Sequence, residues 1–110
     1  MREKKKRRLA DKGWRVGSAG EFLGLSAEES AYIEIRLALA DAIKRRRRRK
    51  RVTQEDLART VGSSQSRIAK MEAGDPSVSV DLLIRSLLTL GASRRKVSRI
   101  ISSRSPIPAA

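Results

Sequence analysis

The chain contains no cysteine and no histidine among its 110 residues. Without cysteine it can form neither a disulfide nor a thiolate metal site. Without histidine it lacks the commonest general base and the commonest metal ligand of proteins. No pattern of paired carboxylates replaces them. These absences argue against an enzyme and predict no catalytic residue, no bound metal and no cofactor.

Aromatic residues and long apolar runs are also scarce. The chain has one tryptophan, one tyrosine and one phenylalanine, which is little for a protein that binds RNA by stacking bases on aromatic rings. No apolar run approaches the length of a membrane span. The charged N-terminus lacks the apolar stretch of a secretory signal. We therefore expect a cytoplasmic protein that makes no membrane contact.

Acidic residues are outnumbered: the chain has 12 Asp and Glu and 26 Lys and Arg, which gives a formal net charge of +14. This imbalance predicts a polyanionic partner, with nucleic acid first and an anionic membrane surface second. Eight consecutive cations occupy residues 44–51. Adjacent like charges repel along a helix and exceed what its dipole requires, which favours phosphate contact over a merely solvated helix end. The basic stretch at residues 4–8 is compatible with a non-specific arm, a minor-groove arm or a solubilising tail.

The apolar periodicity and the capping residues predict a chain of helices. Ser26 and Glu29 form a capping box that begins a long helix over residues 28–47. Ser79 begins a leucine-rich helix and Ser93 a shorter one. The apolar residues that these last two helices are expected to turn inward are Leu82, Leu83, Leu87, Leu90, Val97, Ile100 and Ile101. They exceed what one small core requires, so intramolecular packing and a dimer face remain equal alternatives.

Residues 53–74, TQEDLARTVGSSQSRIAKMEAG, have the pattern of two short helices joined by a glycine turn. Thr53 is an N-cap that Asp56 completes. Gly62 ends the first helix, where a left-handed conformation is cheap for glycine. Ser63 or Ser64 begins the second helix. The expected inward residues are Leu57, Ala58, Val61, Ile68 and Met71, and the expected outward residues of the second helix are Gln65, Ser66, Arg67 and Lys70.

This segment resembles the helix-turn-helix of the Cro/CI-type (XRE) DNA-binding proteins. The shared features are Thr53-Gln54, Leu57-Ala58, Gly62, Ser64-Gln65-Ser66, Ile68 and Glu72-x-Gly74. The resemblance covers residues 39–92 if the flanking helices are included. The sequence departs from the family at Lys50-Arg51-Val52, where a small residue is common, and at Ser63, where an apolar residue is common.

The resemblance implies an all-α fold, a compact five-helix domain similar to that of lambda repressor. We expect this domain over residues 26–101, with its core at 39–92, between a basic, largely irregular arm at 1–25 and a disordered tail at 102–110. In the family the second helix of the motif reads base edges, and the first residues of that helix make the contacts.

Site residues follow from the same resemblance. The expected base-contacting residues are Gln65, Ser66, Arg67 and Lys70, since Gln pairs bidentately with adenine and Arg with guanine. Gln54 resembles the family glutamine that touches a phosphate and steadies the recognition glutamine. The expected phosphate-contacting residues are Gln54, Arg47, Arg48, Arg49, Lys50, Arg51 and Ser64.

The sequence thus predicts a transcriptional regulator that binds double-stranded DNA as a homodimer and represses by occupying its operator. A second resemblance, carried by residues 22–26 and Glu28-Glu29, is to HigA-like antitoxins. It implies a toxin protein as partner, bound through the arm and the first helix. Trp14 and Phe22 in the arm are expected to cover a hydrophobic edge of the domain, with an anchor for another protein or a second subunit as the alternative. The alternatives are therefore an antitoxin whose main activity is to sequester its toxin, or a general nucleic-acid-binding protein.

Overall fold

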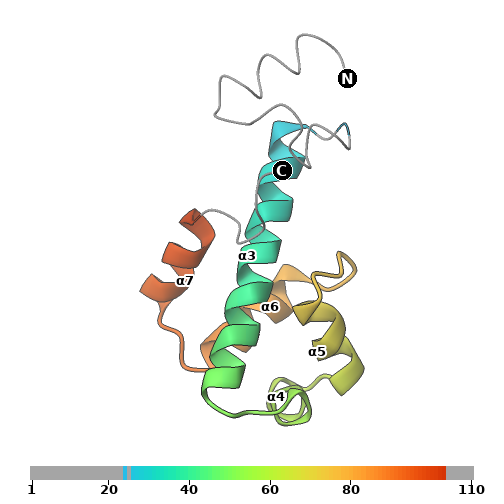
Figure 1. The fold of residues 1–110 in the computed structure, drawn as a ribbon, viewed down its shortest axis with the longest axis vertical. Helices are drawn as coiled ribbons and strands as arrows, with labels where there is room; N and C mark the ends of the chain where they lie inside the picture. The colour runs from blue at the N-terminus through green and yellow to red at the C-terminus, as the bar shows by residue number, and fades with distance from the viewer. Residues whose placement is uncertain (1–23, 25, 104–110) are drawn as a thin grey trace. The chain divides into compact units, whose positions relative to one another are not determined.

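A computed structural model describes residue 24 and residues 26–103, and this range holds five α-helices and no strand. The helices, shown in Figure 1, are α3 (Ala27–Arg49), α4 (Gln54–Val61), α5 (Gln65–Glu72), α6 (Val80–Thr89) and α7 (Arg94–Ser102). The all-α prediction is confirmed for the described residues. The first helix runs to Arg49, beyond the predicted end, and α7 includes Ser102 of the predicted tail. The predictions for residues 4–8, Trp14 and Phe22 concern positions outside the described residues.

A hydroxyl side chain precedes and caps every one of these helices. The N–H of Ser26 donates to Oε1 of Glu29 at 2.8 Å, and the N–H of Glu29 donates to Oγ of Ser26 at 3.1 Å. The same reciprocal bonds join Thr53 and Asp56 at the start of α4. The serines that begin the other helices, each accepting from the N–H three residues later, are Ser64, Ser79 and Ser93. Each such cap stabilises its helix by about 1 kcal/mol.

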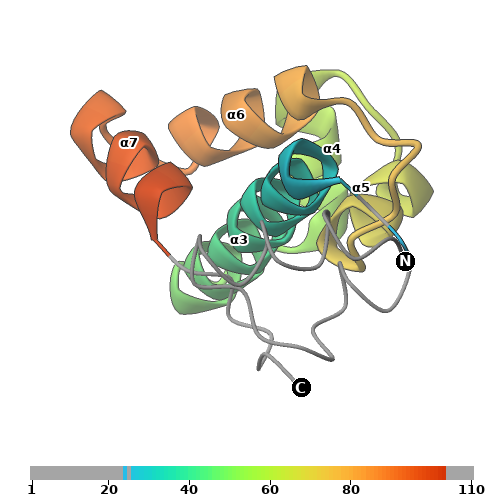
Figure 2. The same ribbon diagram turned by 90° about the horizontal axis from the view of Figure 1, so that it is seen from above.

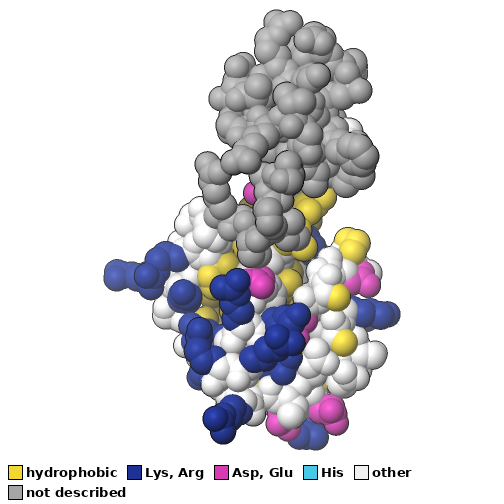
Figure 3. Space-filling view, viewed as in Figure 1, with side chains coloured by type: hydrophobic (Ala, Val, Ile, Leu, Met, Phe, Trp, Pro, Cys, Tyr) yellow, Lys and Arg dark blue, Asp and Glu magenta, His cyan; other side chains and the backbone are white. Residues whose placement is uncertain are grey.

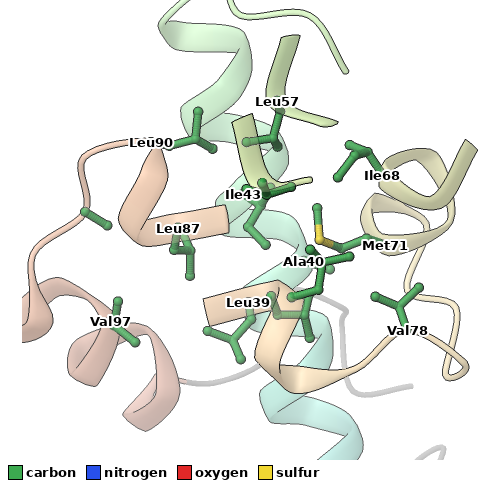
Figure 4. Packing of buried hydrophobic residues seen from close by; sticks show 14 of the residues in the cluster. Leu39, Ala40, Ile43, Leu57, Ile68, Met71, Val78, Leu87, Leu90 and Val97 are labelled. Carbon is green, nitrogen blue, oxygen red and sulfur yellow. The ribbon is translucent and has the colours of Figure 1, made fainter. Parts of the chain in front are cut away.

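The chain divides into two units, and the hydrophobic core belongs to the unit of residues 35–106. Within this unit the C-terminal half of α3 supplies Leu39 and Ile43, both fully buried. Apolar side chains of the four later helices converge on them, as Figure 4 shows. The helix α4 packs against α5 and α6, and α6 packs against α7. The core therefore fixes the two motif helices against the end of α3.

The apolar residues of the last two helices belong mainly to this core. Six of the seven are buried: Leu82, Leu83, Leu87, Leu90, Val97 and Ile100. Ile101 is the exception, because 37% of it is exposed. Leu88 is also exposed, at 45%. The apolar excess that suggested a dimer face is therefore smaller than the sequence indicated, since the turn at Gly91 brings both helices onto the same core.

The connection after α5 is tied to α3 by a buried arginine. The guanidinium of Arg36 donates to the carbonyl oxygen of Asp75 at 3.0 Å and to that of Val78. Gly74 has a φ of +82°, and a Cβ there would lie 2.8 Å from Cδ2 of Leu37. Only glycine satisfies both the backbone angle and this close approach. These contacts fix the C-terminal end of α5 relative to α3.

Candidate nucleic-acid interface

The turn between α4 and α5 sets the position of the exposed helix. Gly62 adopts the left-handed conformation with φ 71° and ψ 40°, and its N–H points back to the carbonyls of Ala58 and Arg59. No atom would contact a Cβ at Gly62 within 4 Å, so the backbone angle alone selects glycine. Ser64, rather than Ser63, is the N-cap of α5. Because its Oγ accepts from the N–H of Arg67, its own O–H remains available as a donor.

The helix α5 has a buried face and an exposed face. Ile68 and Met71 are 0% and 1% exposed. The outward residues predicted from the sequence are all exposed: Gln65, Ser66, Arg67 and Lys70. A rotation of about 100° per residue explains this division. The predicted orientation of α5 is therefore confirmed, while contact of these residues with bases stays a prediction.

Gln54 and Gln65 are joined directly, as the family resemblance implies. Nε2 of Gln65 donates to Oε1 of Gln54 at 2.7 Å, and Nε2 of Gln54 donates to Oε1 of Glu72 at 3.0 Å. A carboxylate only accepts hydrogen bonds, so Glu72 fixes which end of the Gln54 amide faces it. The other end of that amide then fixes Gln65. This leaves Oε1 and the second Nε2 hydrogen of Gln65 available, and these are the acceptor and the donor with which glutamine pairs with adenine.

Glu72 is in turn held by Arg47, across 25 residues of sequence. Nε of Arg47 donates to Oε2 of Glu72 at 2.5 Å, and Nη2 donates to Oε1 at 2.9 Å. The side chains of Arg47 and Glu72 are only 11% and 4% exposed. Burial alone would raise the pKa of Glu72, but the hydrogen bonds from Arg47 and Gln54, with the charges of Arg47 and Lys44, hold this pKa below its ordinary value. The hydrogen bond to Glu72 raises the pKa of Arg47 in return.

These four side chains form one chain of contacts, the orienting network, which consists of Arg47, Glu72, Gln54 and Gln65. The sequence placed Arg47 among the phosphate-contacting cations, but its third donor, Nη1, also bonds inside the protein, to the carbonyl oxygen of Val52 at 2.9 Å. The guanidinium thus connects α3 to α5 and to the loop before α4. Sequence reasoning used Glu72 only as a feature shared with the family and predicted no contact for it. The available signal was that it is the one acidic residue of α5.

The remaining cations of the 44–51 run point in different directions. Arg48, Arg49, Lys50 and Arg51 are exposed. Arg51 has a φ of 58°, uncommon for a residue with a side chain. A Cβ at Gly91 would lie 2.8 Å from Nζ of Lys50, so this ammonium group lies against the turn that ends α6. Figure 3 shows Lys and Arg side chains gathered over both the lower part of α3 and α7. The run does not form a single patch beside α5.

Comparison with known proteins agrees with this geometry. A family model described as helix-turn-helix matches residues 43–97, half of the chain. The match begins in the buried part of α3 and ends in α7. No curated protein and no solved structure matches the chain. Across residues 24 and 26–103, no helix has the length and apolar character needed to cross a membrane.

Proposed function

The chain belongs to the Cro/CI-type (XRE) helix-turn-helix family of DNA-binding transcription regulators, and from this premise we propose that α5 reads the bases of an operator. The observation that carries the proposal is the orienting network. A free glutamine samples many rotamers, whereas Gln65 is held at one end by Gln54. Ordering this side chain before binding lowers the entropic cost of the base contact.

We propose Gln65, Ser66, Arg67 and Lys70 as the base-reading set, because all four are exposed on α5. Gln54 reaches a phosphate through its backbone N–H at the start of α4, since its side-chain amide is engaged at both ends. Ser64 donates its free O–H to a second phosphate. Arg48 and Arg51 supply cationic phosphate contacts. Arg47 is left out of this set because its donors bond within the protein.

Repression by occupancy of the operator is the mode of regulation that we propose. A single α5 presents few base-reading side chains, so two copies on a roughly palindromic site give the required specificity. Their recognition helices would lie about one duplex turn apart, ~34 Å. Leu88 and Ile101 are the exposed apolar side chains available on α6 and α7 for such a homodimer. A toxin-binding role stays a prediction, because the arm with Trp14 and Phe22 lies outside the described residues.

The experiment begins with selection of a preferred sequence from a pool of random duplexes. Affinities of the wild type and of Gln65→Ala are then measured for the selected duplex and for a scrambled one. Loss of the base contact should cost about 1–3 kcal/mol on the selected duplex and little on the scrambled one. Ser98→Ala, at an exposed position of α7, is the control and should change neither affinity. Equal losses on both duplexes would show that Gln65 does not read bases.

A further inference from the structure

A groove of about 280 Å³ lies between α3 and α7. Its floor is small and apolar and includes Ala42 and Ile100. Its rim carries Arg45, Arg46 and Arg49 from α3, and Lys96 from α7. We call it the α3–α7 groove. It belongs entirely to the unit of residues 35–106.

The charge of this groove is almost all of one sign. The single carboxylate of its lining, Asp41, is paired with Arg45 at 2.8 Å. Among the described residues, Arg46, Arg49 and Lys96 make no ion pair. Arg49 lies three and four residues after the two other arginines, spacings at which like charges repel along a helix. An anion with several charges in the groove would relieve that repulsion.

The groove faces away from the helix that reads the operator. Lys44 and Arg47 act on Glu72 beside α5, whereas Arg45, Arg46 and Arg49 line the α7 side. Figures 1 and 2, viewed at right angles, both place α5 and α7 on opposite sides of α3. A straight duplex seated on α5 therefore leaves the α3–α7 groove unfilled.

We propose that the α3–α7 groove binds the phosphate backbone of a second DNA segment without reading its sequence. The proposal rests on the proposed role of α5 as the operator-reading helix. An extended polyanion fits better than a compact one, because the cations lie on two helices. The helix α7 also carries Arg99 and contains no acidic residue. Arg45 and Arg49 are exposed, and the side chain of Arg45 is 70% exposed. Such side chains follow phosphates and give no fixed geometry toward bases.

A bridging assay tests the proposal with the full chain. Beads carry the selected operator duplex, protein is added, and capture of a labelled second duplex is measured, with either operator or random sequence. The wild type should capture both labelled duplexes equally. Arg46→Gln with Lys96→Gln should reduce that capture about tenfold or more, since at ~0.1 M salt each lost phosphate contact weakens binding about eightfold. Retention of protein on the bead-bound operator should change much less.

Arg94→Gln with Arg95→Gln is the matched control, because it removes the same charge from exposed positions of α7 outside the groove lining. It should keep most of the capture. Arg49→Glu is a second groove variant, at an exposed position where a change of side chain leaves the core intact. It should lose capture as the double variant does.

Several results would overturn the proposal. Equal loss in the groove variant and in the control would mean that only overall charge matters. Preferential capture of the labelled operator would assign bridging to the recognition helix of a second copy. Competition by polyglutamate as strong as that by DNA of equal charge would make the groove a site for an acidic protein. Failure of the wild type to bind the bead-bound operator would remove the proposed function itself, and this is distinguishable from operator binding without capture.

Discussion

Glu72→Gln should destabilise the domain strongly, although it changes only the last side chain of a short helix. Glutamine keeps the shape of glutamate but loses its charge. Arg47 would then remain charged with no carboxylate, in a place where its side chain is only 11% exposed. The amide NH₂ of glutamine would also replace one acceptor oxygen and face a donor of Arg47 or of Gln54. The substitution thus tests both halves of the orienting network.

The magnitude follows from the burial of the pair. Removal of one partner of a buried ion pair costs about 3–5 kcal/mol, whereas an exposed pair is worth about 0–1 kcal/mol. The Glu72 side chain is 4% exposed and accepts three hydrogen bonds from Arg47 and Gln54. Because the amide oxygen of glutamine can keep the bonds made to Oε1, we expect the lower end, about 3 kcal/mol. For a domain of this size that corresponds to a fall in Tm of about 12–24 °C.

Urea and thermal unfolding monitored by circular dichroism measure this loss. Asp81→Asn is the control, since the Asp81–Arg85 pair is exposed and its atoms are 3.5 Å apart. It should change the free energy of unfolding by less than about 0.5 kcal/mol. A loss below about 1 kcal/mol for Glu72→Gln would refute the reasoning, because the pair would then behave as an exposed one.

Replacing both partners, with Arg47→Met and Glu72→Leu, separates folding from recognition. Apolar residues of similar volume often replace a buried ion pair with little loss of stability. We expect the double variant to unfold within about 1 kcal/mol of the wild type, yet to discriminate poorly between selected and scrambled duplexes. Unchanged discrimination would show that Gln54 orients Gln65 without Glu72.

Three further predictions concern other parts of the domain. The pKa of Glu72 lies below its ordinary 4.5, so the ionised carboxylate should stabilise the fold above about pH 4.5, and this stabilisation should be lost as the pH falls through the lower pKa of the folded state. The free energies of unfolding in urea of the wild type and of Glu72→Gln should therefore converge in acid and differ at neutral pH. Arg51→Gly should raise the free energy of unfolding by up to about 1 kcal/mol, because φ is 58° there, and should weaken DNA binding about eightfold at ~0.1 M salt; a destabilised variant would argue against backbone strain at this residue. Leu88→Glu with Ile101→Glu should abolish the proposed homodimer in sedimentation without unfolding the domain, whereas Leu87→Glu should unfold it. A dimer that survives the first pair of changes would use another surface.

The sequence predicted helix boundaries well where the causes are local. A hydroxyl residue before a helix, a left-handed glycine after it and an apolar period of 3.6 residues all act within a few positions. The start of α4 at Thr53 and its end at Gly62 were found in this way. The buried and exposed faces of α5 also followed from periodicity alone. These features require no knowledge of the rest of the chain.

Features that depend on distant parts of the chain were not predictable in the same way. The bonds between Arg47 and Glu72 span 25 residues of sequence. Because Arg47 stands in a run of arginines, the sequence alone does not distinguish it from its neighbours. The apolar residues from Leu82 to Ile101 were equally ambiguous, because their division between core and surface depends on how α6 and α7 meet. Periodicity predicts on which face of its own helix a residue lies, but it does not predict which other part of the protein packs against that face.

The run of cations shows how adjacent identical residues acquire different roles. Each step along α3 rotates the side chain by about 100°, so consecutive residues can face different surfaces. Arg47 turns inward to Glu72, and Arg46 turns to the α3–α7 groove. Beyond the helix, Lys50 lies against the turn at Gly91. On the proposed roles of α5 and of the groove, we therefore expect the high net charge not to act as one DNA-binding patch. A salt dependence measured on a single duplex should report only the cations on the α5 side, and those of the groove should appear when a second duplex is present.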